Sequence, residues 1–178
     1  MAPTPANQIP VSVRRKTAAV HEAGHALVAI VYKRDVTGAM LRTPNGLSGE
    51  TQFKDAADVM LDLNEASNRL IIENAIIVLL AGQVAEAAFW DKLKSSYAPQ
   101  VDTHRHDDAE IERYKKGFDF TKEQDVAFIG HCKKKAQFIL YDKRSQAAIE
   151  EIATKLCKSF YVSRAEIDEI LIKHDVIT

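Results

Sequence analysis

The chain has 178 residues, of which 46% are hydrophobic, with 24 basic and 25 acidic side chains. This length and composition suit one compact domain with a single hydrophobic core. Because the charges nearly cancel, the totals show neither the basic footprint of a nucleic-acid-binding protein nor a polybasic membrane surface. We therefore expect no nucleic acid among its partners.

Three features favour a single cytoplasmic domain. Residues 1–12 are rich in proline and lack the apolar core of a secretory signal, which predicts a flexible arm in front of one domain at 13–178. Cys132 and Cys157 are far apart and outside any CxxC pattern, so we expect neither a disulfide framework nor a thiolate zinc site. The most apolar stretch, 74–85, is shorter than the roughly 20 residues that span a bilayer, so we expect no direct membrane insertion.

The first predicted element is a helix over 13–32, where apolar residues recur at helical spacing. It contains the sequence His-Glu-Ala-Gly-His at 21–25. Two imidazoles at this spacing lie one turn apart on one face of a helix, so both can bind the same metal ion. Zinc accepts neutral imidazole nitrogens and, in catalytic sites, leaves one coordination position to water. We therefore predict a Zn2+ cofactor held by His21 and His25.

Glu22, beside the first of these histidines, is the predicted catalytic residue. Bound zinc lowers the pKa of its water toward about 7, and an adjacent carboxylate can take the water's proton and return it to the departing amine. The alternative is an exposed helix face that carries histidines by chance. The apolar run at 26–31 argues against this alternative, because burying two histidines and a glutamate without a metal or partners is costly.

The chain beyond the first helix predicts a small β element and then a long helix. β-favouring residues around a Pro-Asn-Gly turn at 44–46 predict a hairpin or short sheet over 36–53. A polar loop is expected at 55–62, followed by an apolar helix over 64–90 at the centre of the core. Residues 91–107 show no sustained periodicity and predict an irregular loop.

The last third of the chain is predicted to be helical. One helix begins near Asp107, and two more follow capping boxes, formed by Thr121 with Gln124 and by Ser163 with Glu166. The fold class is therefore mainly α. We predict a helical bundle that carries the His-Glu-Ala-Gly-His helix, with a small β hairpin or sheet after it.

Several segments together resemble the zinc peptidase domain of the FtsH family of ATP-dependent proteases. The similar stretches lie at 21–29, 42–46, 49–51, 79–86, 152–156 and 166–171. The resemblance covers roughly 13–171. It implies a zinc-dependent metalloendopeptidase that hydrolyses peptide bonds by attack of a zinc-bound water.

The resemblance also implies a third zinc ligand, an aspartate that follows a threonine-containing loop at the start of a downstream helix. Matching the threonine to Thr103 puts this ligand at Asp108, with Asp107 as the alternative, and the other aspartate is expected to cap the helix. From the residues alone, the third ligand is any His, Asp or Glu that folding brings near the first helix. Glu86 is such a candidate, but we favour a role in which it orients a ligand histidine through a hydrogen bond.

The loop that precedes this aspartate departs from the family. His104, Arg105 and His106 replace small residues, and the two histidines are interpreted as ordinary loop residues or as substitute ligands. The hairpin at 36–53 resembles the family's edge strand, where an extended substrate can pair as an added strand, with a purely structural hairpin as the equal alternative.

One further difference from the family affects the expected partners and the alternative functions. No Gly-x-x-x-x-Gly-Lys phosphate loop occurs in the sequence, so the expected substrates are peptides or unfolded protein segments, with a separate ATPase or a homo-oligomer as further partners. The alternative function is a catalytically inactive FtsH-like module that binds or regulates, although the intact Glu22 argues against it. Hydrolysis of another carbonyl compound is a third alternative, since only the resemblance selects peptides.

Overall fold

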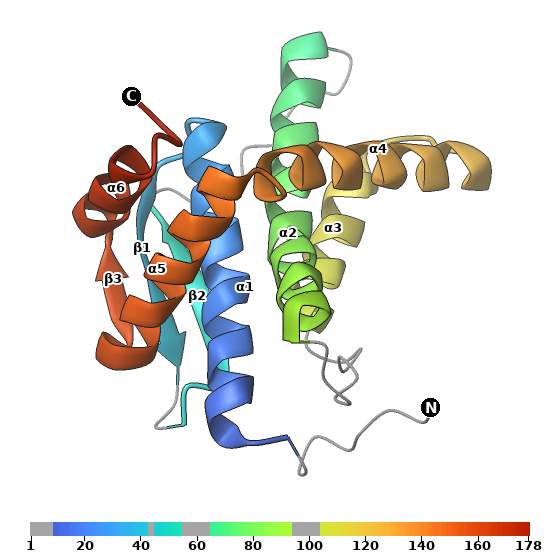
Figure 1. The fold of residues 1–178 in the computed structure, drawn as a ribbon. Helices are drawn as coiled ribbons and strands as arrows, with labels where there is room; N and C mark the ends of the chain where they lie inside the picture. The colour runs from blue at the N-terminus through green and yellow to red at the C-terminus, as the bar shows by residue number, and fades with distance from the viewer. Residues whose placement is uncertain (1–8, 43–44, 55–64, 94–103) are drawn as a thin grey trace.

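The computed structural model describes residues 9–42, 45–54, 65–93 and 104–178. It confirms the predicted fold class, a mainly helical protein with a small antiparallel sheet (Figure 1). The elements are α1 (Val11–Val31), β1 (Val36–Arg42), β2 (Ser48–Phe53), α2 (Ala66–Leu93), α3 (Arg105–Lys115), α4 (Lys122–Leu140), α5 (Lys143–Ser159), β3 (Tyr161–Ser163) and α6 (Arg164–Lys173).

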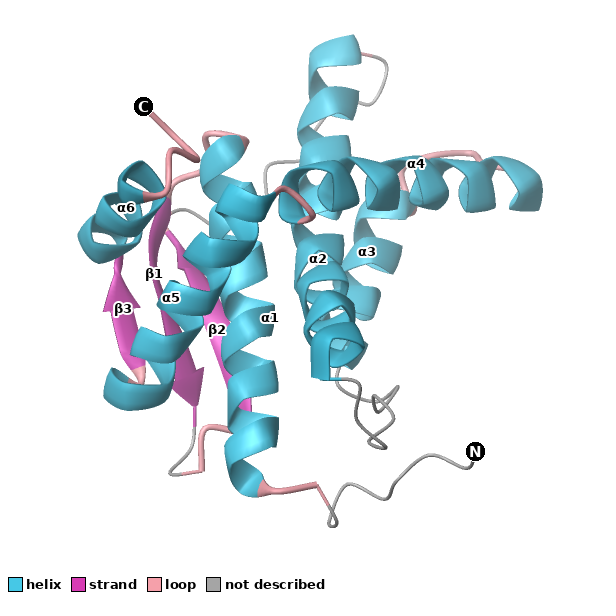
Figure 2. Cartoon of the chain, in the orientation of Figure 1, coloured by secondary structure: helices cyan, strands magenta, loops and turns pink. Residues whose placement is uncertain are grey.

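Helix α1 is the central element of the fold. Figure 2 shows the three strands gathered on one side of α1 and helices α2 to α4 on the other. Every residue from Ala19 to Ile30 is buried, which is the expected state of a helix that is covered on several faces. The His-Glu-Ala-Gly-His sequence therefore lies at the middle of the molecule, and the elements that surround it can all contribute to one site.

The sheet has the strand order β2-β1-β3, so β2 lies at one edge and has one neighbour among the described strands. Antiparallel pairing of β1 with β2, with Ala39 opposite Thr51, confirms the predicted hairpin. Strand β3 is a correction to the prediction that the last third is helical. It is three residues long and directly follows Phe160, whose left-handed backbone (φ 62°) ends α5 and turns the chain toward β1.

The long apolar helix predicted at 64–90 is observed as α2. By length and composition this helix could cross a membrane, but 61% of its most apolar window is buried inside the protein. Packing in the core accounts for this apolar character. The loop expected at 55–62 lies outside the described residues. At the ends of the loop expected at 91–107, α2 continues to Leu93 and α3 already begins at Arg105.

Both predicted capping boxes are present. The Thr121 hydroxyl accepts a hydrogen bond from the backbone N–H of Gln124, and the Gln124 side chain accepts from the backbone N–H of Thr121 at 2.9 Å. Ser163 and Glu166 form the same reciprocal pair at the start of α6. The first helix begins at Val11, and residues 1–8 of the predicted arm lie outside the described part of the chain.

Candidate metal centre

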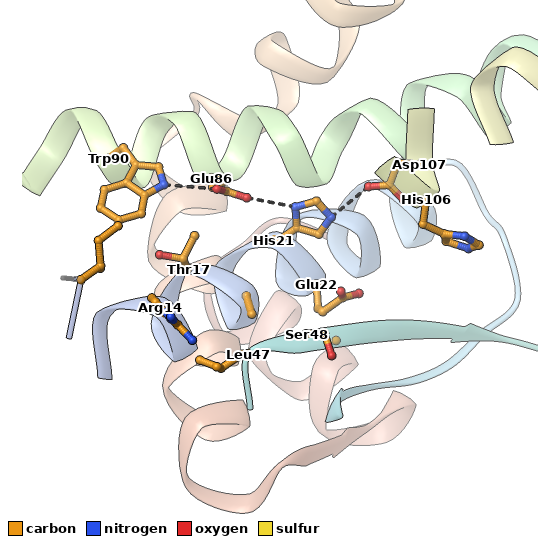
Figure 3. Close-up of a pocket in the computed structure, with 13 residues that line it drawn as sticks. Arg14, Thr17, His21, Glu22, Leu47, Ser48, Glu86, Trp90, His106 and Asp107 are labelled. Carbon is orange, nitrogen blue, oxygen red and sulfur yellow. Dashed lines mark hydrogen bonds and ion pairs between the residues drawn. The ribbon is translucent and has the colours of Figure 1, made fainter. Parts of the chain in front are cut away.

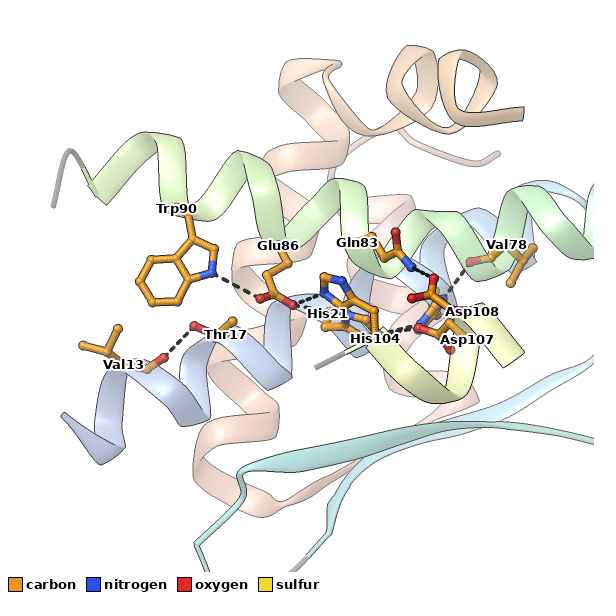
Figure 4. A network of polar contacts seen from close by, with 11 residues as sticks. Val13, Thr17, His21, Val78, Gln83, Glu86, Trp90, His104, Asp107 and Asp108 are labelled. Atoms are coloured by element: carbon orange, nitrogen blue, oxygen red, sulfur yellow. Dashed lines mark hydrogen bonds and ion pairs between the residues drawn. The ribbon is translucent and has the colours of Figure 1, made fainter. Parts of the chain in front are cut away.

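Three side chains from two helices bring one ligand atom each to a common point (Figure 4). On α1, the Nε2 atoms of His21 and His25 lie 2.9 Å apart. From the first turn of α3, Asp107 places Oδ2 3.0 Å from His21 Nε2 and 3.3 Å from His25 Nε2. All three residues are buried. The two imidazoles therefore lie on one face of α1 and contact each other, as their spacing in the sequence predicts.

The size of this triangle fits a zinc ion. In a tetrahedral zinc site with metal–ligand distances of about 2.0–2.1 Å, neighbouring ligand atoms are about 3.3 Å apart. The three observed separations run from 2.9 to 3.3 Å. Two imidazole nitrogens and one carboxylate oxygen are also ligands that zinc prefers. The donor set therefore fits the predicted Zn2+ and leaves a fourth position for water.

The aspartate that joins the histidines is Asp107, the alternative in the sequence analysis, and not Asp108. Asp108 points elsewhere, and its Oδ1 accepts a hydrogen bond from Gln83 Nε2 at 2.7 Å. The expected helix cap is wrong as well, because the N-cap residue of α3 is His104 and no side chain caps it. Successive residues of an α-helix project about 100° apart, so the start of α3 decides which of two adjacent aspartates faces α1.

Each ligand histidine is held through its other ring nitrogen. His25 Nδ1 lies 2.7 Å from the carbonyl oxygen of Val78, so it is the protonated nitrogen and donates to that oxygen. His21 Nδ1 lies 3.4 Å from Glu86 Oε2. These contacts from α2 leave both Nε2 atoms to bind a metal, and such supporting partners fix the orientation of ligand histidines.

Glu86 has the orienting position that the sequence analysis favours for it. It is buried, its Oε2 lies 2.9 Å from His104 Nε2, and its Oε1 accepts a hydrogen bond from Trp90 Nε1 at 3.2 Å. His104 also stacks on the ring of His21, with the ring centroids 5.3 Å apart. Of the two loop histidines, His104 thus belongs to the network around His21, as Figure 4 shows.

The carboxylates around His21 give the site a strong preference for positive charge. Burial by itself lowers the pKa of His21, but hydrogen bonds to Asp107 and Glu86 outweigh it and raise the pKa to about 10. Burial opposes ionisation of Glu86, yet its contacts with His104 and His21 lower its pKa to about 2. Burial acts against Asp107 in the same way, and the two histidines hold its pKa well below the usual range. A divalent cation would satisfy the same carboxylates, and its binding would displace the proton of His21.

Glu22 lies against the edge strand of the sheet. The Thr51 hydroxyl donates a hydrogen bond to Glu22 Oε2 at 2.9 Å. Gly49 lies directly below the carboxylate, and a Cβ atom at that position would come within 2.7 Å of Glu22 Oε1. Strand β2 therefore positions the carboxylate. The sequence alone does not predict the contact of either β2 residue with Glu22, because this contact requires the folded structure.

Gly82 on α2 lies against the imidazoles of the candidate metal centre. A Cβ atom here would lie 2.5 Å from His25 Nε2 and 2.6 Å from His21 Nε2, so no larger residue fits beneath the imidazoles. A glycine inside a long apolar helix is unfavourable without a packing or functional reason. That local rule was the signal in the sequence that could have assigned Gly82 to the site.

Two cavities flank Glu22 and form one cleft along β2. The first, of about 510 Å³, lies on the His21 side and reaches Leu47 and Trp90 (Figure 3). The second, of about 370 Å³, lies on the His25 side. Both are lined by Glu22, Gly49, His106 and Asp107, so the two cavities meet at the metal centre.

No known protein-family model matches the chain, and no curated protein matches it.

Proposed function

We propose that the protein is a zinc-dependent metalloendopeptidase. The observation that carries the proposal is the convergence of His21 Nε2, His25 Nε2 and Asp107 Oδ2 within 3.3 Å of one another, beside a cleft that Glu22 lines. Zinc in this triangle would supply a water of lowered pKa and polarise the carbonyl of the substrate. His21 and Asp107 line the first cavity, and His25 and Asp107 line the second.

The residues around the zinc position have distinct roles in this proposal. Asp107, His21 and His25 hold the metal. Glu22 takes the proton of the attacking water and returns it to the leaving amine. The Thr51 hydroxyl engages Glu22 Oε2 and so leaves Oε1 available to the water.

Three features support a peptide as the substrate. Strand β2 lies at the sheet edge, so an extended peptide can pair with it as an added strand. The cleft continues on both sides of Glu22, which suits cleavage within a chain. The segments that resemble the FtsH peptidase domain include the ligand histidines. We propose peptides or unfolded protein segments as substrates, with a separate ATPase or a second copy of the chain as a further partner.

The test compares wild-type protein with Glu22→Gln. The variant keeps all three ligands, so it should bind one zinc per chain but hydrolyse a quenched fluorescent peptide about a hundredfold to ten-thousandfold more slowly. Chelator should abolish wild-type cleavage, and added zinc should restore it. A matched control is Glu110→Gln, because Glu110 lines the same cleft without contacting the ligand triangle and should leave most activity intact.

The proposal fails if Glu22→Gln cleaves peptide at the wild-type rate. Zinc binding without cleavage of any peptide would instead favour the alternative of an inactive binding or regulatory module.

A further inference from the structure

The cavity on the His25 side holds three arginines, and two of them are neutralised. Arg42 contacts Glu50 through Nε at 3.0 Å, and Arg113 contacts Glu110 through Nη2 at 2.7 Å. Each of these pairs lies within the lining of the same cavity. The third arginine in this lining is Arg34.

Arg34 has no carboxylate partner among the residues that the structure describes. Its guanidinium lies over the ring of Phe53, 4.4 Å from the centroid, and the residue is half-buried. Burial lowers the pKa of Arg34 from its ordinary value, because the charge has lost water, and the nearby Tyr114 offsets this loss only in part. Stacking fixes the plane of the guanidinium and leaves its N–H groups free to make a two-pronged contact.

The strand places Arg34 on the path of a bound peptide. Gly49, Thr51 and Phe53 alternate along β2 and so project from the same face. Gly49 and Thr51 contact Glu22, and the ring of Phe53 stacks against the guanidinium of Arg34. Alternate residues of a strand are about 6.6 Å apart, so a peptide paired with β2 passes from Glu22 to Arg34 within two to four residues.

We propose that Arg34 is a specificity-determining residue that binds a carboxylate of the peptide substrate, two to four residues from the cleaved bond. This inference rests on the proposed peptidase function. An acidic side chain and the free C-terminus of a peptide both supply the carboxylate. The planar fork of arginine matches either one through two parallel hydrogen bonds.

Paired peptides test the proposal and separate the two sources. One set shares a single cleavable core and carries either Glu or Gln at each of four positions on either side of the cleaved bond, with an amidated C-terminus. A second set contains no acidic residue and ends in either a free carboxylate or an amide at each of the four positions on the C-terminal side of the cleaved bond. The wild-type protein should prefer the carboxylate at one position by about tenfold or more in kcat/KM, mainly through KM.

Variants of Arg34 test whether this preference depends on that residue. Arg34→Gln should remove it, so that the two members of each peptide pair are cleaved equally, while Arg34→Lys should retain only part of it, because lysine lacks the fork. The matched control is Arg42→Gln, which removes an arginine that Glu50 already neutralises and should keep the preference. Thermal unfolding of each variant checks that the stack on Phe53 is not required for folding.

A binding measurement keeps this test independent of catalysis. Fluorescence anisotropy of the same peptides, labelled with fluorescein, on Glu22→Gln protein should show the same Arg34-dependent preference. If that preference appears in binding without cleavage by the wild type, Arg34 binds a peptide carboxylate but selects no cleavage site, and the peptidase proposal fails. If wild-type protein cleaves the neutral and acidic members equally, and binding is equal too, the inference is overturned while the peptidase proposal survives.

Discussion

Which aspartate lies beside the two histidines, and so is the candidate third ligand, is decided by the rotation of one helix. Asp107 and Asp108 are adjacent and chemically identical, yet only Asp107 contacts the histidines, while Asp108 contacts Gln83. No rule applied to the sequence fixes the residue at which α3 begins, so both aspartates remained candidates until the fold was known. By contrast, the shared position of His21 and His25 follows from their spacing alone, because that spacing on any helix gives a shared face.

This pair of aspartates offers a sharp comparison of single substitutions. Asp107→Asn should weaken zinc binding by more than the roughly 10–100-fold that the loss of a supporting contact causes, because it removes a ligand and its charge. Asp108→Asn should leave zinc affinity within about twofold. Competition with a chromophoric chelator measures both. Equal losses in the two variants would contradict the assignment of Asp107.

The elevated pKa of His21 predicts how the metal-free protein responds to pH. Its pKa rises from 6.5 in the unfolded chain to about 10 in the folded protein. A raised pKa contributes stability that is complete below pH 6.5 and is lost as the pH rises through about 10. Urea unfolding of chelator-treated protein should therefore show a stability difference between wild type and His21→Gln that shrinks as the pH increases. A difference that stays constant over this range would disprove the prediction.

At the scale of the element, the two helix starts marked by capping boxes were predictable and the short strand was not. The capping boxes at Thr121 and Ser163 depend on residues three apart, so a local pattern is enough to locate them. Strand β3 has three residues and forms only because Phe160 ends α5 beside β1. The orienting contacts of α2 with the histidines likewise arise from packing between distant segments.

Gly82 shows how the metal centre constrains a whole helix. Replacing a helical glycine with alanine normally stabilises a protein by up to about 1 kcal/mol. Gly82→Ala should instead abolish zinc binding, because the new Cβ would collide with His21 and His25. Gly130→Ala on α4 is the matched control, since nothing lies within 4 Å of its added Cβ, and it should raise the melting temperature and keep the metal. Calorimetry and zinc titration of both variants decide the question.

At the scale of the whole molecule, the candidate metal centre joins α3 to α1. His21 and Asp107 are 86 residues apart in the sequence, and α2 lies behind both ligand histidines. Sequence periodicity predicts each helix separately, but it gives no information on how α3 packs against α1. A metal that binds only the folded arrangement therefore stabilises the entire fold.

Zinc should accordingly raise the thermal stability of the protein. At a free concentration about 1,000 times the dissociation constant, the added stability is about 4 kcal/mol, which shifts the melting temperature of a protein of this size by on the order of 10 °C. Asp108→Asn should show the full shift and Asp107→Asn little or none. A shift of equal size in Asp107→Asn would mean that zinc stabilises the protein at another place.

The long separation between His21 and Asp107 also sets when the proposed active site could first assemble during synthesis of the chain. The early histidines emerge first, but they lack their aspartate until α3 has been synthesised and docked. The proposed active site therefore cannot assemble on a growing chain before α3 has been synthesised and has packed against α1.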